Sequence, residues 1–209
     1  MAYLVKELFF TLQGEGARTG RAAVFLRFAG CNLWNGREVD RASAACTFCD
    51  TEFVGTDGPG GGRFESPEAL AARARSLFPD GGVPYVVCTG GEPLLQLDEP
   101  LVRALHDAGF EVAIETNGTL PAPAGIDWIC VSPKAGSALV LRAGHELKLV
   151  HPQEGAAPEA FESLAFDHFF LQPMHGLLTK QNTDRVIAHC RAHPRWRLSL
   201  QTHKILGIP

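Results

Sequence analysis

Apolar runs alternate with amphipathic segments along most of the chain. Six or seven runs of apolar and β-branched residues predict buried strands, namely residues 22–28, 84–89, 111–116, 127–132, 146–150, 168–172 and 197–202. Most of these runs are nearly continuous rather than alternating with polar residues, which is typical of parallel strands covered on both faces. The pattern therefore favours a parallel sheet with elements packed on each side.

Three segments between these runs have the spacing and the start signals of helices. Residues 66–78 begin with serine, proline and glutamate, which provide an N-cap and an N1 proline ahead of an apolar face. Residues 98–109 begin with Asp-Glu-Pro and end at a glycine, and a third helix is expected from Asn182 to just before Pro194. Strands that alternate with helices indicate right-handed βαβ units.

The length of the chain limits how complete such a fold can be. Its 209 residues are fewer than the roughly 250 typical of a full eight-fold barrel. We therefore expect an α/β fold, an incomplete, splayed parallel (β/α) barrel of about six strands with reduced helices, that is, a modified partial TIM barrel. The glycine-rich residues 55–63 are interpreted as a loop, because the alternation continues across them. Residues 1–209 are accordingly expected to form a single domain.

Composition and charge exclude several classes of protein. The apolar fraction of 45%, the charged fraction of 20% and the net charge of −4 are ordinary for a globular protein, and they give no electrostatic reason to expect nucleic-acid or membrane-surface binding. The first residues lack the pattern of a signal peptide, and no run reaches the roughly 18 apolar residues of a spanning helix. A cytoplasmic location is expected, where clustered cysteines are metal ligands or catalytic thiols rather than disulfides.

The polar and unusual tripeptides gather directly after the predicted strands. In parallel α/β folds the loops at the carboxyl ends of the strands meet at one face and carry the site. The segments that fall there are residues 31–36, 89–93, 116–118, 132–134, 172–175 and 202–204. The sequence therefore predicts one site built from all six loops.

Three of the six cysteines lie together: Cys31, then Cys46 after fourteen residues, then Cys49 after two more. A four-iron cluster held by three thiolates has one iron free to bind another molecule. Zinc with a fourth ligand elsewhere, such as Asp50 or a histidine, is comparably compatible with the spacing alone. The aromatic Phe48 between the last two cysteines, and the position directly after the first parallel strand, favour the iron–sulfur cluster.

With these features the chain resembles the radical S-adenosylmethionine enzymes. Their cluster motif has a cysteine, a three-residue gap, a second cysteine and, after an intervening aromatic, a third; here the first gap is fourteen residues long. Residues 90–93, GGEP, match a second signature of that superfamily, which contacts the methionine amino group. Two independent signatures at matching places in a βα alternation support the resemblance.

Further motifs narrow the resemblance to the 7-carboxy-7-deazaguanine synthase family, in the subgroup with an enlarged cluster loop. They are FTLQGEG (10–16), CTFCDT (46–51), CTGGEP (88–93), ETNGT (115–119), VSPK (131–134), QPM (172–174) and QTHK (201–204). The resemblance implies a carbon–nitrogen lyase that converts 6-carboxy-5,6,7,8-tetrahydropterin into 7-carboxy-7-deazaguanine with loss of ammonia, on the route to 7-deazapurines such as queuosine. It also implies a [4Fe-4S] cluster, S-adenosylmethionine, Mg²⁺, a reductant protein such as a flavodoxin, and a homodimer.

The same resemblance implies roles for particular residues of one radical S-adenosylmethionine core domain, with an enlarged cluster loop at residues 31–49. Cys31, Cys46 and Cys49 would hold the cluster and Thr51 the Mg²⁺. The substrate would contact Leu12, Gln13, Gly14, Glu15, Arg27, Thr89, Glu115, His203 and Pro209. S-adenosylmethionine would contact Phe48, Cys49, Asp50, Gly91, Ser132, Pro133, Lys134, Gln172, Pro173, Met174 and His175. No side chain is expected to be catalytic, because the cofactor carries the radical chemistry.

Physical chemistry is compatible with these roles and also with plainer ones. Arg27 can bind the substrate carboxylate in a bidentate pair or form a salt bridge at the rim of the sheet. Glu15 and Glu115 can accept the paired N–H donors of a 2-aminopyrimidinone edge, although Glu15 could instead be a polar surface residue. Thr51 offers a neutral oxygen suited to Mg²⁺, or it caps a turn. The terminal carboxylate at Pro209 accepts hydrogen bonds in the site or belongs to a frayed tail.

Some residues receive no role, and two other functions stay open. Cys88, Cys130 and Cys190 are interpreted as small buried hydrophobic residues, and the six remaining histidines outside the motifs, at positions 106, 145, 151, 168, 189 and 193, show no ligand-like spacing. One alternative is a radical S-adenosylmethionine activase that makes a glycyl radical on a partner. The other is a non-enzymatic, zinc-stabilised binding module, which would hold zinc but no iron.

Overall fold

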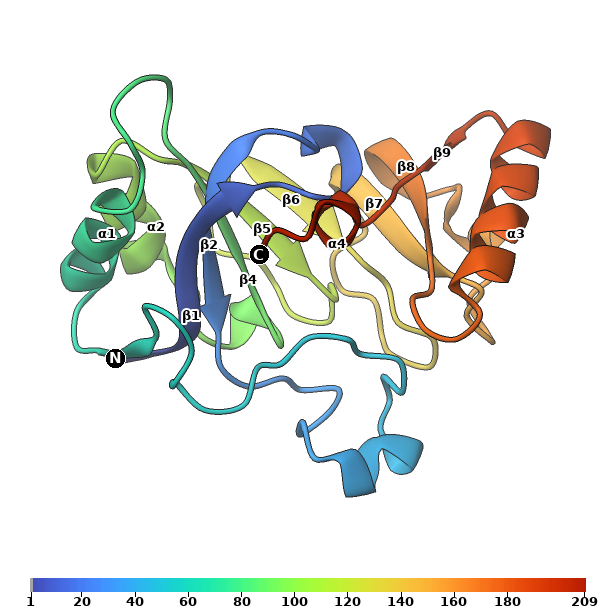
Figure 1. Cartoon of the computed structure of the whole chain (residues 1–209), viewed down its shortest axis with the longest axis horizontal. Coiled ribbons are helices and arrows are strands. Elements are labelled where there is room, and N and C mark those ends of the chain that lie inside the picture. The colour runs from blue at the N-terminus through green and yellow to red at the C-terminus, as the bar shows by residue number, and fades with distance from the viewer. Residues whose placement is uncertain (1) are drawn as a thin grey trace.

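A computed structural model describes residues 2–209, and within them a single nine-stranded sheet runs through the molecule in the order β3-β1-β2-β4-β5-β6-β7-β8-β9. The strands are β1 (Tyr3–Leu12), β2 (Ala22–Phe28), β3 (Gly62–Phe64), β4 (Tyr85–Gly90), β5 (Glu111–Thr116), β6 (Trp128–Val131), β7 (Ala143–His151), β8 (Ala165–Pro173) and β9 (Trp196–Leu198). β2 and the strands from β4 to β9 are parallel, whereas β1 pairs with β2 and β3 in the antiparallel sense. The sheet is open, as expected for a partial barrel (Figure 1).

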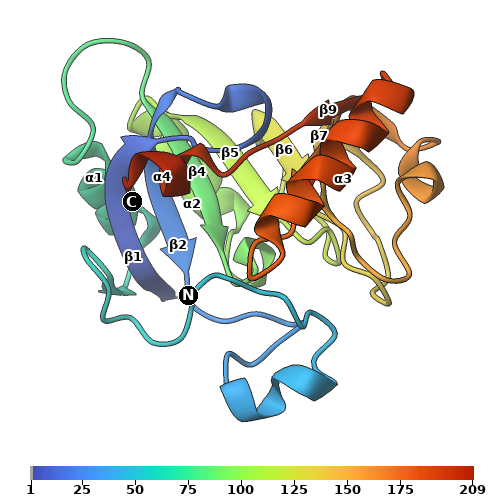
Figure 2. The ribbon, with the colours of Figure 1, turned by 45° about the vertical axis from the view of Figure 1, so that its right-hand side comes forward.

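Helices are few, and they cover the two ends of the sheet. They are α1 (Pro67–Arg75), α2 (Glu99–Asp107), α3 (Thr179–Ala192) and the short α4 (Thr202–Leu206), together with 3₁₀ turns η1 (Gly16–Arg18), η2 (Glu38–Ser43), η3 (Pro93–Leu95) and η4 (Pro158–Phe161). α1 and α2 pack side by side at one end, and α3 packs on β8 and β9 at the other (Figures 1 and 2). Every helix within residues 2–209 is too short or too polar to cross a bilayer.

The predicted start signals of the first two helices are confirmed. The Ser66 hydroxyl accepts a hydrogen bond from the backbone N–H of Ala69 (3.2 Å), and the Asp98 carboxylate accepts one from Leu101 (3.0 Å). Each cap is followed by a proline in the first turn, where the missing N–H would have no partner anyway. Local sequence therefore determines where both helices begin.

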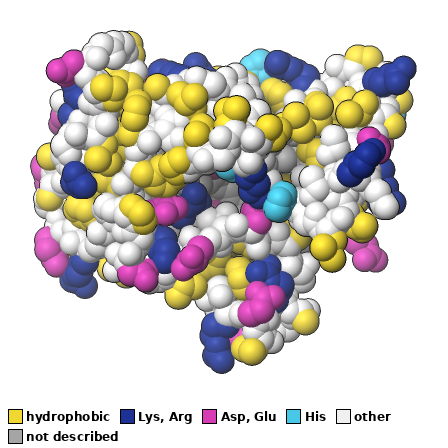
Figure 3. All heavy atoms as spheres, in the orientation of Figure 1, with side chains coloured by type: hydrophobic (Ala, Val, Ile, Leu, Met, Phe, Trp, Pro, Cys, Tyr) yellow, Lys and Arg dark blue, Asp and Glu magenta, His cyan; other side chains and the backbone are white. Residues whose placement is uncertain are grey.

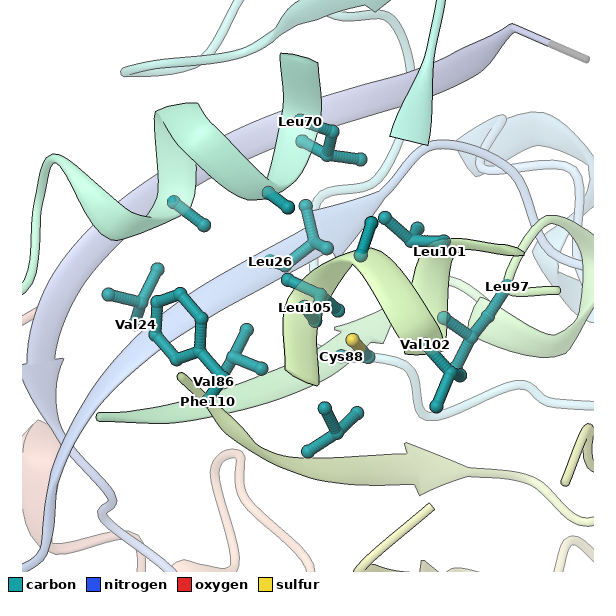
Figure 4. Packing of buried hydrophobic residues seen from close by; sticks show 14 of the residues in the cluster. Val24, Leu26, Leu70, Val86, Cys88, Leu97, Leu101, Val102, Leu105 and Phe110 are labelled. Atoms are coloured by element: carbon teal, nitrogen blue, oxygen red, sulfur yellow. The ribbon is translucent and has the colours of Figure 1, made fainter. Parts of the chain in front are cut away.

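The larger apolar core lies between α1 and α2 and the first half of the sheet. Leu26, Leu70, Leu101 and Leu105 are fully buried there, and Cys88 of β4 packs among them (Figure 4). Burying one such leucine contributes about 1.5–3 kcal/mol relative to exposure. Cys88 thus behaves as the predicted small hydrophobic residue, and the partly buried Cys190 packs against a second core formed by β7, β8, β9 and α3. Cys130 is buried as predicted, but its thiol donates a hydrogen bond to Glu146 (3.5 Å).

The observed elements differ from the predicted ones in four places. β1 and β3 were not predicted, because β1 is an antiparallel strand whose exposed and buried positions alternate for only part of its length, and β3 lies in a glycine-rich segment. The strand predicted for 197–202 ends at Leu198; Ser199 N still donates to Leu171 O (2.9 Å), but Thr202 bonds Gly14 O and begins α4. α3 begins at Thr179 rather than at Asn182, whose amide donates to Met174 O (2.9 Å).

Charged and aromatic side chains close the sheet interior at the amino ends of the parallel strands. The guanidinium of Arg18 lies over the Trp128 ring at 4.1 Å, and that of Arg21 lies over Tyr85 at 3.9 Å. Both arginines pair with the carboxylate of Glu111, at 3.2 and 2.6 Å. This closure leaves the carboxyl ends of the strands as the accessible end of the interior.

Candidate functional site

A cavity of about 440 Å³ opens at the carboxyl ends of the strands. Its size is that of a site for a small organic ligand. In the space-filling view the face of the molecule is hollowed there, with charged side chains and a histidine around the opening (Figure 3). All six predicted loops reach this cavity, so the expectation of one shared site agrees with the geometry.

Every residue to which the resemblance gave a site role lines this cavity, with one exception. The lining includes Leu12, Gln13, Gly14, Glu15, Arg27, Cys31, Cys46, Phe48, Cys49, Asp50, Thr51, Thr89, Gly91, Glu115, Ser132, Lys134, Gln172, Pro173, Met174, His175, His203 and Pro209. Pro133 is buried beside it, and its carbonyl accepts a hydrogen bond from Gln153 (3.4 Å). Which ligand each residue contacts stays a prediction.

Folding of the cluster loop brings the three cysteines to one wall of the cavity. Leu33 O accepts hydrogen bonds from the backbone N–H groups of Ala45 (3.1 Å) and Cys46 (3.4 Å), which closes the neck of the loop. Residues 35–45 project outward from this neck (Figures 1 and 2). Although fourteen residues separate Cys31 from Cys46, the two ends of this segment are therefore held close together.

Arg41 stabilises the projecting part from within. Its guanidinium lies 4.0 Å from the ring of Trp34, and Nη1 donates to the carbonyls of Thr47 (3.2 Å) and Cys49 (3.0 Å). Trp34 in turn packs edge-on against Phe53, with ring centroids 5.6 Å apart. Contacts among residues of the loop, together with Phe53 just after it, therefore stabilise the projecting part.

The environment of the thiols suits a bound cation. Burial raises the pKa of both Cys46 and Cys49, and each neighbouring thiolate raises it further, whereas the ammonium of Lys134 lowers that of Cys46. Thiolates are the form that binds metal, so loading must displace protons from this group. Three unpaired thiols on one wall fit an iron–sulfur cluster that leaves one iron open. Asp50, the open choice for a fourth zinc ligand, is instead paired with Lys204 and bonded by Gln201.

The GGEP sequence of the loop after β4 has a packing reason that the sequence did not reveal. Glu92 is fully buried and accepts hydrogen bonds from Leu94 N (2.9 Å), Thr116 Oγ1 (2.7 Å) and Asn117 N (2.8 Å). Burial raises its pKa, and these donors oppose that rise. An added Cβ on Gly91 would overlap Gly30 O, so only glycine allows this loop to approach the cluster loop so closely.

Arg27 forms the salt bridge at the rim and also lines the cavity, so binding of the substrate carboxylate stays a prediction. Its Nε lies 2.6 Å from Glu7 Oε1 on the neighbouring strand β1, which is the salt bridge at the rim. The two terminal nitrogens form no hydrogen bond with another residue in the part of the chain described, and Arg27 lines the cavity. A carboxylate ligand could therefore bind these nitrogens without breaking the existing pair.

The C-terminal segment closes one side of the cavity. The backbone N–H and the hydroxyl of Thr202 both donate to Gly14 O, at 2.9 Å each, and Thr11 Oγ1 donates to the carbonyl of Pro209 (2.9 Å). A Cβ on Gly14 would overlap the ring of His203. Burial lowers the pKa of His203, which favours a neutral imidazole at the site.

Sequence reasoning missed a polar group at the bottom of the cavity. Lys148 lies in the middle of β7 and is almost completely buried, with its ammonium 2.6 Å from Glu15 and 3.2 Å from Glu115. Gln13 and Gln201 donate to the same two carboxylates. A lysine inside the apolar run ELKLV was the available signal, because a buried ammonium requires anionic partners.

One pair of histidines does have ligand-like spacing, contrary to the sequence interpretation. His189 lies on α3 and His193 caps its C-terminus, and with Glu159 of η4 they bring three potential ligand atoms within 4.8 Å of one another. The group lies outside the cavity, and Glu159 and His193 are exposed. We assign it no function.

Comparison with known proteins agrees with the fold and the cavity. A family model described as the Radical SAM superfamily matches residues 40–148, so the chain is a radical S-adenosylmethionine protein, a class that implies a [4Fe-4S] cluster and S-adenosylmethionine. Curated proteins named 7-carboxy-7-deazaguanine synthase are 65% identical in Bordetella pertussis, over 210 residues, and 64% identical in Bradyrhizobium diazoefficiens, over 209 residues. Both alignments cover 100% of each chain.

A crystal structure of QueE from Escherichia coli is 30% identical and superposes with a TM-score of 0.69, covering 96% of this chain and 94% of that one. The chain belongs to the 7-carboxy-7-deazaguanine synthase family.

Proposed function

We propose that this protein is a carbon–nitrogen lyase that converts 6-carboxy-5,6,7,8-tetrahydropterin into 7-carboxy-7-deazaguanine with loss of ammonia, in 7-deazapurine biosynthesis. The observation that carries the proposal is the shared cavity, which is lined by the three-thiol loop together with Arg27, Glu15 and Glu115. A cluster loop alone would suit any member of the superfamily. The guanidinium and the two carboxylates in the same cavity favour a small ligand that has both an anionic group and a donor-rich edge.

The proposed ligand set follows the chemistry of each donor. Cys31, Cys46 and Cys49 would hold the [4Fe-4S] cluster, which supplies the electron that cleaves S-adenosylmethionine when bound. The loops at Ser132 and at residues 172–175 would bind the cofactor, with Lys134 held by Ser132 O and Oγ at 2.7 Å each. Thr51 would provide a neutral oxygen for Mg²⁺, since its hydroxyl forms no hydrogen bond to another residue in the range 2–209.

The substrate would lie between the sheet and the C-terminal segment. Arg27 would bind its carboxylate, and Glu15 and Glu115 would accept N–H donors of the pyrimidinone ring. Leu12, Gln13, Gly14 and Thr89 would contact the ring system, and His203 and Pro209 would cover it. These residues bind, orient and exclude water, while the bound cofactor performs the bond cleavage.

The organisation of the protein is part of the same proposal. Residues 1–209 would be one radical S-adenosylmethionine core domain with residues 31–49 as its enlarged cluster loop. We further propose a homodimer, a cytoplasmic location and reduction by a small protein such as a flavodoxin. Sedimentation analysis would measure the dimer, and a monomer at micromolar concentration would contradict it.

An anaerobic assay tests the activity directly. The reconstituted, reduced protein is incubated with 6-carboxytetrahydropterin, S-adenosylmethionine and Mg²⁺, and product and ammonia are measured together. Equal amounts of 7-carboxy-7-deazaguanine and ammonia are expected from the natural protein and from Cys190→Ala, whose thiol lies on α3 away from the cavity. The Cys46→Ala variant is expected to hold no cluster and to show no activity. Absence of product with a fully loaded cluster would refute the proposed function.

A further inference from the structure

Lys148 is a buried cation placed between two carboxylates on the wall of the cavity. Its side chain is 4% exposed, and its ammonium forms ion pairs with Glu15 Oε2 (2.6 Å) and Glu115 Oε2 (3.2 Å). The three residues come from β7, from the turn after β1 and from β5. An ammonium so far from water is stable only because both anions compensate it.

The remaining carboxylate oxygens are held by two glutamines. Gln13 Nε2 donates to Glu115 Oε1 (2.9 Å), and Gln201 Nε2 donates to Glu15 Oε1 (3.0 Å). Gln13 also accepts a hydrogen bond from the backbone N–H of Glu15 (3.0 Å), which links the two halves of the group. Each carboxylate has about four acceptor positions, so both retain positions for a ligand after these contacts.

The charge of Lys148 affects the protonation of Glu15. Burial alone would raise the pKa of Glu15, but the adjacent Lys148 and the Gln201 hydrogen bond outweigh burial and lower it. The titratable groups around Lys148 are Glu15, Glu115, Glu146, Cys130 and Lys134, and His203 lies near Glu15. Of these, Glu146 has a pKa raised by burial, and it accepts hydrogen bonds from Ala17 N (2.9 Å) and Cys130 Sγ (3.5 Å).

We infer that Lys148 is a positioning residue: its ammonium pairs with both Glu15 and Glu115 and holds the two carboxylates side by side, so that both present acceptor oxygens to the N–H donors of the ligand. The identity of that ligand, a 2-aminopyrimidinone edge, rests on the proposed function. Lys148 itself does not react and acts only through the two carboxylates. It also joins three segments that are distant in sequence, so it fixes the separation of the acceptors.

Removal of the cation has a defined consequence. In Lys148→Met the side chain keeps its volume, but the partly buried carboxylate of Glu15 loses the cation that opposes the effect of its burial. The pKa of Glu15, now depressed, rises in this variant. Carboxylate acceptors are therefore lost at a higher pH than in the natural protein, and the acid limb of kcat/KM moves to higher pH.

Two measurements on the cluster-loaded protein test the inference. The first is a carbon-13 NMR titration of glutamate carboxyl groups, in which Glu15→Gln identifies the Glu15 signal. Lys148→Met should titrate this signal at least about one pH unit higher, and Lys148→Arg should restore most of the natural value. Lys180→Met is the matched control, because Lys180 is 90% exposed on α3 and pairs only with Asp184. An unchanged Glu15 titration in Lys148→Met would overturn the inference.

The second measurement is the pH dependence of turnover. Lys148→Met should raise KM for the pterin at least about tenfold, shift the acid limb upward and leave iron content and substrate-free cleavage of S-adenosylmethionine unchanged. A lower melting temperature with no shift of the acid limb would assign Lys148 a purely structural role and refute its positioning role. If the carboxyl titration shifts but the natural protein does not convert the pterin, the inference stands and only the proposed function fails.

Discussion

Arg27 is held at one nitrogen and has two others for a ligand, which makes its substitution informative. In Arg27→Ala the substrate carboxylate loses a charge-assisted pair, which weakens binding by about 1.5–3 kcal/mol, or roughly 10- to 150-fold in Kd. Iron content should not change, because Arg27 is not in the cluster loop. Calorimetric titration with the pterin measures the effect.

A matched arginine provides the control for that experiment. Arg63 pairs with Glu65 at 2.7 Å, but both side chains are largely exposed and lie on the sheet edge away from the cavity. Arg63→Ala should therefore bind the pterin as the natural protein does. If Arg27→Ala also bound it with natural affinity, Arg27 would have only the rim salt bridge with Glu7.

At the same scale, the sequence predicted most of the cavity residues but not how they are held. Arg27, Glu15 and Glu115 could be chosen because charged groups at the ends of apolar strands need a partner. Their partners Glu7, Gln201 and Lys148 could not be chosen, because they are distant in sequence and come together only through the register of the sheet. Pro133 shows the opposite limit: a motif residue can be buried beside a site without lining it.

The turn after β1 depends on a glycine that has two separate constraints. Gly16 has a φ of +67°, and an added Cβ would overlap the Glu146 carboxylate. Gly20 has a φ of +87° with nothing within 4 Å of an added Cβ. Gly20→Ala should lower the free energy of unfolding by about 1–2 kcal/mol. Gly16→Ala should lower it by more, because Glu146 must also move and release Ala17 N. Urea unfolding measures both, and equal losses would contradict the clash.

The elements predicted correctly are those whose signals are local. Neighbouring residues alone determine the helix starts at Ser66 and Asp98. The same holds for the continuous apolar runs of β2, β4 and β5. β1 was missed because its pairing with β2 and β3 stabilises it, not its own apolar pattern. The segment after Leu198 was assigned to a strand because SLQT has the composition of one, whereas the hydrogen bond from Thr202 to Gly14 O turns the chain away. Tertiary contacts overrode local preference in both places.

For the molecule as a whole, the cavity joins both halves of an open sheet, so its ligands should stabilise the entire fold. A ligand at about a hundred times its Kd adds about 2.7 kcal/mol, which corresponds to a rise of roughly 5–11 °C in Tm for a chain of this size. Saturating S-adenosylmethionine should produce such a shift in the cluster-loaded protein. Calorimetry measures it, and Cys46→Ala, without a cluster, should show a smaller shift.

The predicted fold class is confirmed, but the sheet is larger than the sequence indicated. About six parallel strands were expected, whereas seven parallel strands and two antiparallel ones are present within residues 2–209. The additional strands lie at the β3 edge, where β1 and the residues around Gly58 pack against each other. Apolar runs predict the central strands of a sheet well, because both faces of these strands are buried. They predict edge strands poorly, because edge strands have fewer apolar residues.

The closed neck of the cluster loop has a consequence for how such a protein can change over generations. Leu33 O bridges to Ala45 and Cys46, and Arg41 and Trp34 support what lies beyond, so the distance between Cys31 and Cys46 does not depend on the number of residues between them. Substitutions in residues 35–44 other than Arg41 would alter the protrusion while the thiols stay in place, whereas loss of Arg41 would release the carbonyls of Thr47 and Cys49. The spacing that first looks like a broken motif is a folded protrusion that one guanidinium ties back to the cysteine segment.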